Sequence, residues 1–126
     1  MTNTFHLFVY GTLRSGGPAT NLLSGAEKVG EGTVGGVLYD IDGEFPALIV
    51  YGRTPVQGEV WRCPAPLLSA LDSYERIDSG LFRRIGVEAA LFDGGVVPCW
   101  AYVAGPRLAA KLTPARRIDS WGVTAT

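Results

Sequence analysis

Short apolar runs, separated by turns rich in glycine and proline, make up most of the chain. Their length and their content of β-branched and aromatic residues are typical of β-strands. The expected strands comprise residues 5–10, 34–41, 45–50, 56–62, 82–92 and 96–103. In the first strand, alternation places Phe5, Leu7 and Val9 on one face and His6, Phe8 and Tyr10 on the other. The turn at residues 93–95, Asp-Gly-Gly, predicts a hairpin between the last two strands.

One segment has the spacing of an amphipathic helix instead. Residues 66–75 begin at a proline, which suits the first turn of a helix because the missing N–H group costs nothing there. At about 100° per residue, one apolar stripe is formed by Leu67, Leu68, Leu71 and Tyr74. Glu75 falls inside this stripe, so its carboxyl group is expected on the core-facing side of the helix.

Two interpretations of Glu75 stay open at this point. If its carboxyl group is desolvated, the pKa rises toward the range that is useful for proton transfer. Alternatively, Glu75 is only the last residue of the helix and turns out to solvent or caps a neighbour. Only the first interpretation makes Glu75 a candidate general acid or base.

Many short strands, 17 glycines and a single helix predict an α+β fold. We expect a small β-barrel, closed or nearly closed, with helices packed on its outside. A chain of 126 residues has the size of one domain. We therefore expect a single domain over residues 1–126, with a core at about 5–105 and a weakly structured tail at about 107–126, in which Trp121 is the candidate anchor.

The first expected strand ends abruptly in a turn. In the stretch LFVYGTLRSG, residues 7–16, the apolar run stops at Gly11 and polar residues follow. A strand that ends in this way can point several backbone N–H groups into one small space, which forms an anion-binding concavity. The turn from residue 11 onward therefore indicates a ligand that carries a carboxylate or phosphate group.

Composition and charge exclude several classes of protein. The 11 basic and 12 acidic residues leave a net charge of −1, whereas nucleic-acid binders normally have a basic excess or stripe. No stretch of roughly 18 uninterrupted apolar residues indicates a membrane span, and the first residues lack the pattern of a signal peptide. Cys63 and Cys99 lack CxxC spacing, which suits a reducing cytoplasm, and a disulfide between them stays open. We therefore expect a cytoplasmic protein without nucleic-acid or membrane partners.

The sequence predicts neither a metal site nor a bound cofactor. His6 is the only histidine, and no cysteine cluster accompanies it. The stretch GEGTVG at residues 30–35 matches the GxGxxG pattern, but strand-like residues follow it where a dinucleotide-binding motif needs a helix. Ser15 has no partner histidine other than His6, so we do not expect a serine hydrolase.

Six short motifs follow one another between residues 5 and 105. They are VYGTLRSG at 9–16, FPAL at 45–48, VQGEVW at 56–61, LDSYE at 71–75, FRR at 82–84 and CWAYV at 99–103. In this order they resemble the gamma-glutamylcyclotransferase-like family, in particular its short members akin to gamma-glutamylamine cyclotransferase. Three departures bear on the substrate: Phe82 and Trp61 each stand in place of a tyrosine, and the loop at residues 76–81 is one residue longer.

The resemblance implies a small mixed β-barrel with flanking helices and a chemistry that needs no cofactor. Members of the family cyclise a gamma-glutamyl group: its α-amine attacks its own γ-carbonyl, which yields 5-oxoproline and releases the attached amine. In the matching position, Glu75 would take a proton from the α-ammonium and later give one to the leaving nitrogen. The other implied substrate contacts are the backbone of Tyr10, Gly11, Thr12 and Leu13, the hydroxyl of Tyr102, which would donate to the substrate carboxylate, and Arg84.

A second function remains open beside the enzyme. The same pocket could serve a binding module, without catalysis, for a small carboxylate-bearing metabolite or for the chain terminus of a partner. A buried Glu75 would repel such an anion, which favours the enzyme unless the ligand brings its own ammonium group. The partner we expect is a small gamma-glutamyl substrate; which gamma-glutamyl compound it is, and the oligomeric state of the protein, stay open.

Overall fold

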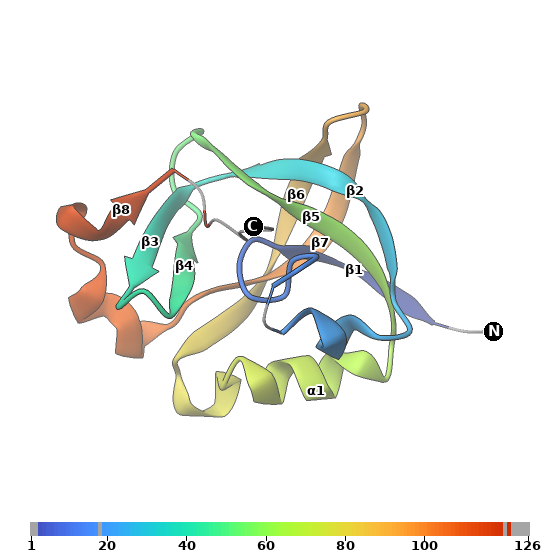
Figure 1. The fold of residues 1–126 in the computed structure, drawn as a ribbon, viewed down its shortest axis with the longest axis horizontal. Helices are drawn as coiled ribbons and strands as arrows, with labels where there is room; N and C mark the ends of the chain where they lie inside the picture. The colour runs from blue at the N-terminus through green and yellow to red at the C-terminus, as the bar shows by residue number, and fades with distance from the viewer. Residues whose placement is uncertain (1–2, 18, 120, 122–126) are drawn as a thin grey trace.

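Five strands close into a barrel in the computed structural model of the protein, which describes residues 3–17, 19–119 and 121 (Figure 1). In their order around the barrel they are β1 (Thr4–Val9), β5 (Pro55–Pro64), β2 (Glu27–Gly35), β6 (Phe82–Leu91) and β7 (Val96–Ala104). Neighbouring strands are antiparallel except β1 and β7, which pair in parallel through Leu7 and Trp100. The predicted α+β class and the mixed barrel are confirmed.

A small second sheet lies beside the barrel and contains β4 (Phe45–Ile49), β3 (Val37–Ile41) and β8 (Arg117–Ile118), in that order. The prediction of one strand over residues 34–41 is wrong, because β2 ends at Gly35 and β3 begins at Val37 in the other sheet. At Gly36 a Cβ atom would come within 2.6 Å of the carbonyl oxygen of Ile49, so only glycine allows the chain to turn so close to β4. Hydrophobic periodicity does not reveal this corner, because apolar residues flank it on both sides.

The predicted helix is confirmed as α1 (Leu67–Tyr74), with Glu75 as its C-terminal cap. Leu71 is buried and Leu67 and Leu68 are half-buried, as the stripe predicts, whereas Tyr74 remains 41% exposed. Four short 3-10 helices complete the structure of the described residues: η1 (Thr20–Leu23), η2 (Ile77–Ser79), η3 (Pro106–Lys111) and η4 (Pro114–Arg116). In Figure 1, α1 and η1 lie on the same side of the barrel, outside its strands.

The tail is more ordered than predicted. It contains η3, η4 and β8, and β8 pairs with β3 through Leu38 with Ile118 and Tyr39 with Arg117. The expectation of weak structure from about residue 107 is therefore wrong up to residue 119; residues 120 and 122–126 lie outside the described part. Trp121 packs against the buried residues of the barrel, which agrees with its predicted role as an anchor.

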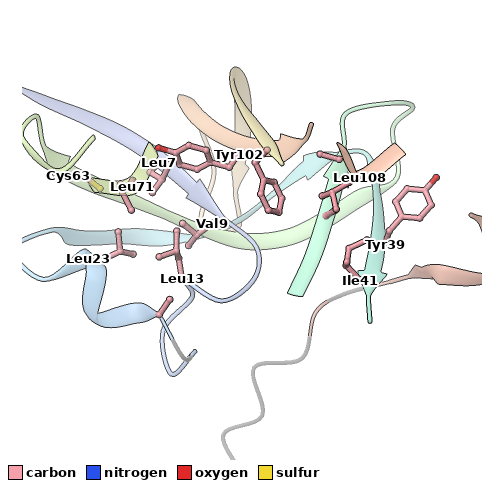
Figure 2. Close-up of a cluster of buried hydrophobic side chains, with 14 residues drawn as sticks. Leu7, Val9, Leu13, Leu23, Tyr39, Ile41, Cys63, Leu71, Tyr102 and Leu108 are labelled. Atoms are coloured by element: carbon pink, nitrogen blue, oxygen red, sulfur yellow. The ribbon is translucent and has the colours of Figure 1, made fainter. Parts of the chain in front are cut away.

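Two clusters of buried side chains share the strands of the barrel. One joins Leu7 and Val9 of β1 to Leu71 of α1 and Leu23 of η1, and Figure 2 shows these side chains close together. The other fills the barrel and includes Phe8 and Tyr10. The predicted alternation along the first strand is therefore confirmed.

Both cysteines are buried free thiols, Cys63 in the first cluster and Cys99 in the second. Burial raises the pKa of each thiol to about 11. The disulfide that the sequence left open is not formed. None of the helices among the described residues has the length and apolar character needed to traverse a membrane.

Candidate functional site

A cavity of about 580 Å³ opens where the turn after β1 meets the second sheet, the end of α1 and η3. This volume lies in the range that is typical of sites for small molecules. Of the residues predicted to form the site, all but one line the cavity: Tyr10, Gly11, Thr12, Leu13, Glu75 and Tyr102. The structure thus brings together three motifs that are far apart in the chain, at residues 9–16, 71–75 and 99–103.

The turn after β1 lines the cavity with Gly11, Thr12 and Leu13. Its carbonyl oxygens are used internally, since the N–H of Arg14 donates to Gly11 at 3.0 Å and that of Ala19 donates to Thr12 at 2.8 Å. In the described part of the chain, no acceptor receives a hydrogen bond from the N–H groups of Gly11, Thr12 or Leu13. The turn therefore places three successive N–H groups without an acceptor among the described residues beside the cavity, and its anion-binding role stays a prediction.

A close contact with β4 fixes the position of this turn. A Cβ atom on Gly11 would come within 2.5 Å of Cγ of Pro46, so the turn packs against the proline ring only because residue 11 is glycine. Pro46 belongs to the FPAL motif, residues 45–48, and also lines the cavity. The VYGT and FPAL motifs therefore build one wall together.

Glu59 on β5 holds the other side of the turn. Its carboxylate accepts hydrogen bonds from the N–H of Ser15 at 2.8 Å, from the Ser15 hydroxyl at 3.2 Å and from the Trp61 indole at 3.1 Å, and it pairs with Lys28 at 3.4 Å. Burial raises the pKa of Glu59, but the hydrogen bonds from Ser15 and Trp61 and the charge of Lys28 outweigh burial, so the pKa lies below its ordinary value. The local sequence does not reveal this role, because Glu59 occupies a polar position in a strand that alternates normally.

Glu75 lies at the C-terminal end of α1 with its side chain half-buried in the cavity wall. Among the described residues, its carboxyl group accepts no hydrogen bond and pairs with no cation. Burial raises the pKa of this group to about 8. Of the two interpretations of Glu75, the structure therefore agrees with the desolvated carboxyl and not with the solvated helix end.

The charge of Glu75 contributes to the raised pKa of two tyrosine hydroxyls, those of Tyr10 and Tyr102. Burial, followed by the charge of Glu75, raises the pKa of Tyr10 far above its ordinary value. For Tyr102, burial and the hydrogen bond to Asp72 raise the pKa, and Glu75 again contributes. Neither phenol is therefore an acid near neutral pH.

The hydrogen bonds of these tyrosines limit what they can do for a ligand. The Tyr10 hydroxyl donates to the carbonyl oxygen of Tyr102 and accepts from the N–H of Leu48 at 3.2 Å. The Tyr102 hydroxyl donates to Asp72 at 2.6 Å. The expected donation from Tyr102 to a substrate carboxylate is therefore not available in this arrangement, and Tyr102 offers a ligand an acceptor oxygen instead.

Arg84 is the predicted site residue that does not line the cavity. Its guanidinium donates to both carboxylate oxygens of Asp72, at 3.0 and 3.3 Å, and lies 4.5 Å from the ring of Trp100. Arg84 pairs in register with Tyr102 on the neighbouring strand, so it contacts the same aspartate as that hydroxyl. Arg84 was expected to contact the substrate, but it lies outside the cavity. Instead, Arg84 orients Asp72, and Asp72 orients the Tyr102 hydroxyl.

The cavity also contains residues that our sequence analysis did not identify as parts of a site. The Tyr74 hydroxyl lies 2.9 Å from the Thr12 hydroxyl and joins α1 to the turn. Arg76, Arg107 and Lys111 line the opening as well. The last two belong to the segment that the sequence suggested to be weakly structured, so no local pattern pointed to them. Within residues 3–17, 19–119 and 121, no three His, Cys, Asp or Glu side chains are grouped to hold a metal ion.

Comparisons with known proteins agree with this architecture. An AIG2-like protein from Mus musculus has a similar structure, with a TM-score of 0.79 and 22% identity over 95% of this chain and 89% of its own. A gamma-glutamyl cyclotransferase also has a similar structure, with a TM-score of 0.68 and 20% identity over 81% of this chain and 67% of its own. A protein specific to uropathogenic E. coli has a TM-score of 0.67 and 25% identity over 93% and 89%.

No curated protein sequence matches the chain. The sequence model of the family described as "Gamma-glutamyl cyclotransferase, AIG2-like", in contrast, matches residues 7–122. This match spans nearly the whole chain and includes both walls of the cavity. The chain therefore belongs to the AIG2-like gamma-glutamyl cyclotransferase family.

Proposed function

We propose that the protein is a gamma-glutamyl cyclotransferase that uses Glu75 as its general acid and base. The observation that carries this proposal is the carboxyl of Glu75, with a pKa of about 8, in the same cavity as three backbone N–H groups. Within the described part of the chain, neither this carboxyl nor these N–H groups have a partner. A carboxyl whose pKa lies near the working pH can both accept and release a proton. The free N–H groups can bind a carboxylate at the same time.

In the proposed reaction, the α-nitrogen of the gamma-glutamyl group attacks the γ-carbonyl carbon of the same group. A new C–N bond closes the five-membered ring of 5-oxoproline, and the bond from the γ-carbon to the leaving nitrogen breaks. Overall, two protons move from the α-ammonium group to the leaving nitrogen. One carboxyl that alternates between its two forms can carry them in turn, and such a residue typically contributes 10²–10⁴-fold to the rate.

The other residues of the cavity bind and orient the substrate in this proposal. The N–H groups of Gly11, Thr12 and Leu13 would take the α-carboxylate of the glutamyl group. The Tyr102 hydroxyl, whose proton is committed to Asp72, would accept a hydrogen bond from the α-ammonium. Holding both ends of the glutamyl group brings the amine and the γ-carbonyl together in the bent conformation that cyclisation requires.

The setting in which the protein acts is part of the proposal. Its partner is a small gamma-glutamyl compound, and the reaction needs no carrier of electrons or groups. The two free buried thiols support a reducing compartment such as the cytoplasm.

The test measures 5-oxoproline release from a panel of gamma-glutamyl compounds by wild type and Glu75→Gln. Glu88→Gln is the matched control, because Glu88 is an exposed glutamate on β6 outside the cavity. We expect Glu75→Gln to lose roughly two to four orders of magnitude in kcat while it remains folded by circular dichroism, and Glu88→Gln to retain wild-type rates. If no compound is turned over but wild type and Glu75→Gln both bind glutamyl-like ligands, the protein is a binding module instead.

A further inference from the structure

Two arginines at the opening of the cavity have no partner of opposite charge among the residues that the structure describes. Arg76 and Arg107 both line the cavity, and in the described part of the structure neither side chain forms an ion pair or a hydrogen bond. Lys111 lines the same opening but is paired with Asp42, which also pairs with Arg116 at 2.8 Å. The two arginines are therefore available to a ligand, whereas the lysine is not.

The backbone connects the segments that carry these arginines. The N–H of Arg107 donates to the carbonyl of Gly80 at 3.2 Å, and the N–H of Leu81 donates to the carbonyl of Arg76 at 3.3 Å. A third bond, from Gly105 to Leu81 at 2.8 Å, joins the end of β7 to the same loop. Arg76 follows Glu75 directly in the chain, and these bonds join the segment that carries Arg107 to the loop that begins at Arg76.

The backbone of Arg76 is strained. Its φ of 55° lies in the left-handed region, where residues other than glycine are uncommon. Strain of this kind collects at functional sites, where the surrounding structure holds it in place. The presence of an arginine at this position, where glycine would fit without strain, agrees with a use for its side chain.

The other charges around the opening do not cancel the two guanidinium groups. Asp42 is already neutralised by Lys111 and Arg116. Glu44, on the turn between β3 and β4, is the remaining carboxylate among the described lining residues apart from Glu75. Among the described lining residues apart from Glu75, the unpaired charged groups thus comprise two cations and one anion, so the opening favours a negatively charged ligand group.

We propose that Arg76 and Arg107 bind a carboxylate on the leaving side of the substrate. The preferred substrate is then a gamma-glutamyl amino acid or peptide, and not the gamma-glutamyl derivative of an uncharged amine. This inference rests on the proposed function and names its substrate class. The substrate would carry two carboxylates, one on the N–H groups of the β1 turn and one on the arginines, with the scissile amide between them beside Glu75.

The test compares two compounds that differ in one charge, gamma-glutamyl-alanine and its C-terminal amide. Hydrogen bonds to charged groups contribute about 1.5–3 kcal/mol each, so we expect wild type to prefer the acid by roughly 10–100-fold in kcat/KM. Arg76→Gln and Arg107→Gln should each reduce this preference about tenfold. Arg53→Gln, at an exposed arginine outside the cavity, should retain it. Arg107→Gln decides the question if the strained position 76 does not tolerate substitution.

The outcomes separate this inference from the proposed function. Equal kcat/KM for the acid and the amide, unchanged in Arg107→Gln, would overturn the arginine site and leave the cyclotransferase intact. If neither compound releases 5-oxoproline, the proposed function fails, and calorimetry on wild type and Arg107→Gln then tests the arginines directly. Tighter binding of the acid by wild type, reduced in the variant, would support the site; equal binding of both compounds, or none, would overturn it.

Discussion

Glu75 ends a helix in a position where its surroundings oppose its charge. The same burial that raises its pKa to about 8 makes the ionised form unfavourable in the folded protein, and the described residues provide no cation to compensate. Glu59, in contrast, is 3% exposed but accepts three hydrogen bonds and pairs with Lys28. Of these two carboxyl groups, only Glu75 is left with unused hydrogen-bonding capacity, which suits proton transfer.

This difference predicts how stability depends on pH. The pKa of Glu75 rises from an ordinary 4.5 to about 8 on folding, so the folded protein binds this proton more tightly. The stabilisation is complete below about pH 4.5 and is lost as the pH rises toward 8. Glu75→Gln should therefore be more stable than wild type at pH 8.5, by about 1–3 kcal/mol after allowance for partial solvent exposure. The difference should shrink or disappear at pH 4.5.

Urea unfolding of wild type and Glu75→Gln at the two pH values measures this effect. Glu88→Gln serves again as the control, since an exposed glutamate should change stability little at either pH. A stability difference between wild type and Glu75→Gln that is the same at both pH values would contradict the assigned pKa.

At the scale of elements, the turn after β1 depends on contacts from other strands. Pro46 of β4 packs on Gly11 from one side, and Glu59 of β5 holds Ser15 from the other. The Tyr74 hydroxyl adds a contact from α1 to Thr12. The three free N–H groups are thus positioned by three elements, and a change at any of them should disturb ligand binding.

A double-mutant cycle at Gly11 and Pro46 tests this dependence. Gly11→Ala places a methyl group within 2.5 Å of the proline ring, so the turn or β4 must shift. We expect a loss of about 1–3 kcal/mol in the free energy of unfolding, which is typical of overpacking, together with weaker substrate binding. In the Pro46→Ala background the same substitution should be less harmful, because the ring is absent. Strictly additive effects would show that the contact is unimportant.

For the whole molecule, the C-terminal segment connects the two sheets to the site. β8 extends the second sheet along β3, Arg116 pairs with Asp42, and Arg14 donates to the carbonyl of Trp121 at 3.0 Å. Lys111, which pairs with Asp42 as well, also lines the cavity. The segment therefore supports the wall of the site as well as the edge of the sheet.

A chain that ends after Leu112 tests this support. It retains η3 and all strands of the barrel but lacks η4, β8 and Trp121. We expect the barrel to fold, with a lower free energy of unfolding and with faster hydrogen exchange in β3, whose edge loses its partner at Leu38 and Tyr39. Unchanged exchange in β3, with full stability, would show that the tail adds nothing to the fold.

Local patterns predicted much of this protein. The alternation along β1, the apolar stripe of α1 with Glu75 inside it, the turn at Gly11 and the hairpin at residues 93–95 all agree with the structure. Each depends on neighbours within a few residues, which constrain backbone conformation and the direction of side chains. The order of the six motifs indicated the family, and the match of the family model over residues 7–122 confirms it.

Contacts between distant residues decided the rest. The corner at Gly36 exists because β4 approaches it, β8 forms because β3 offers an open edge, and Arg84 is drawn to Asp72 away from the cavity. The two arginines at the opening are far apart in the chain. Backbone hydrogen bonds between η3 and the loop around η2 connect the segments that carry them. Sequence alone determined which residue types and local shapes were present, because these follow from short-range sterics and polarity. Only the tertiary structure decided which charges are compensated, because that depends on partners brought together by folding.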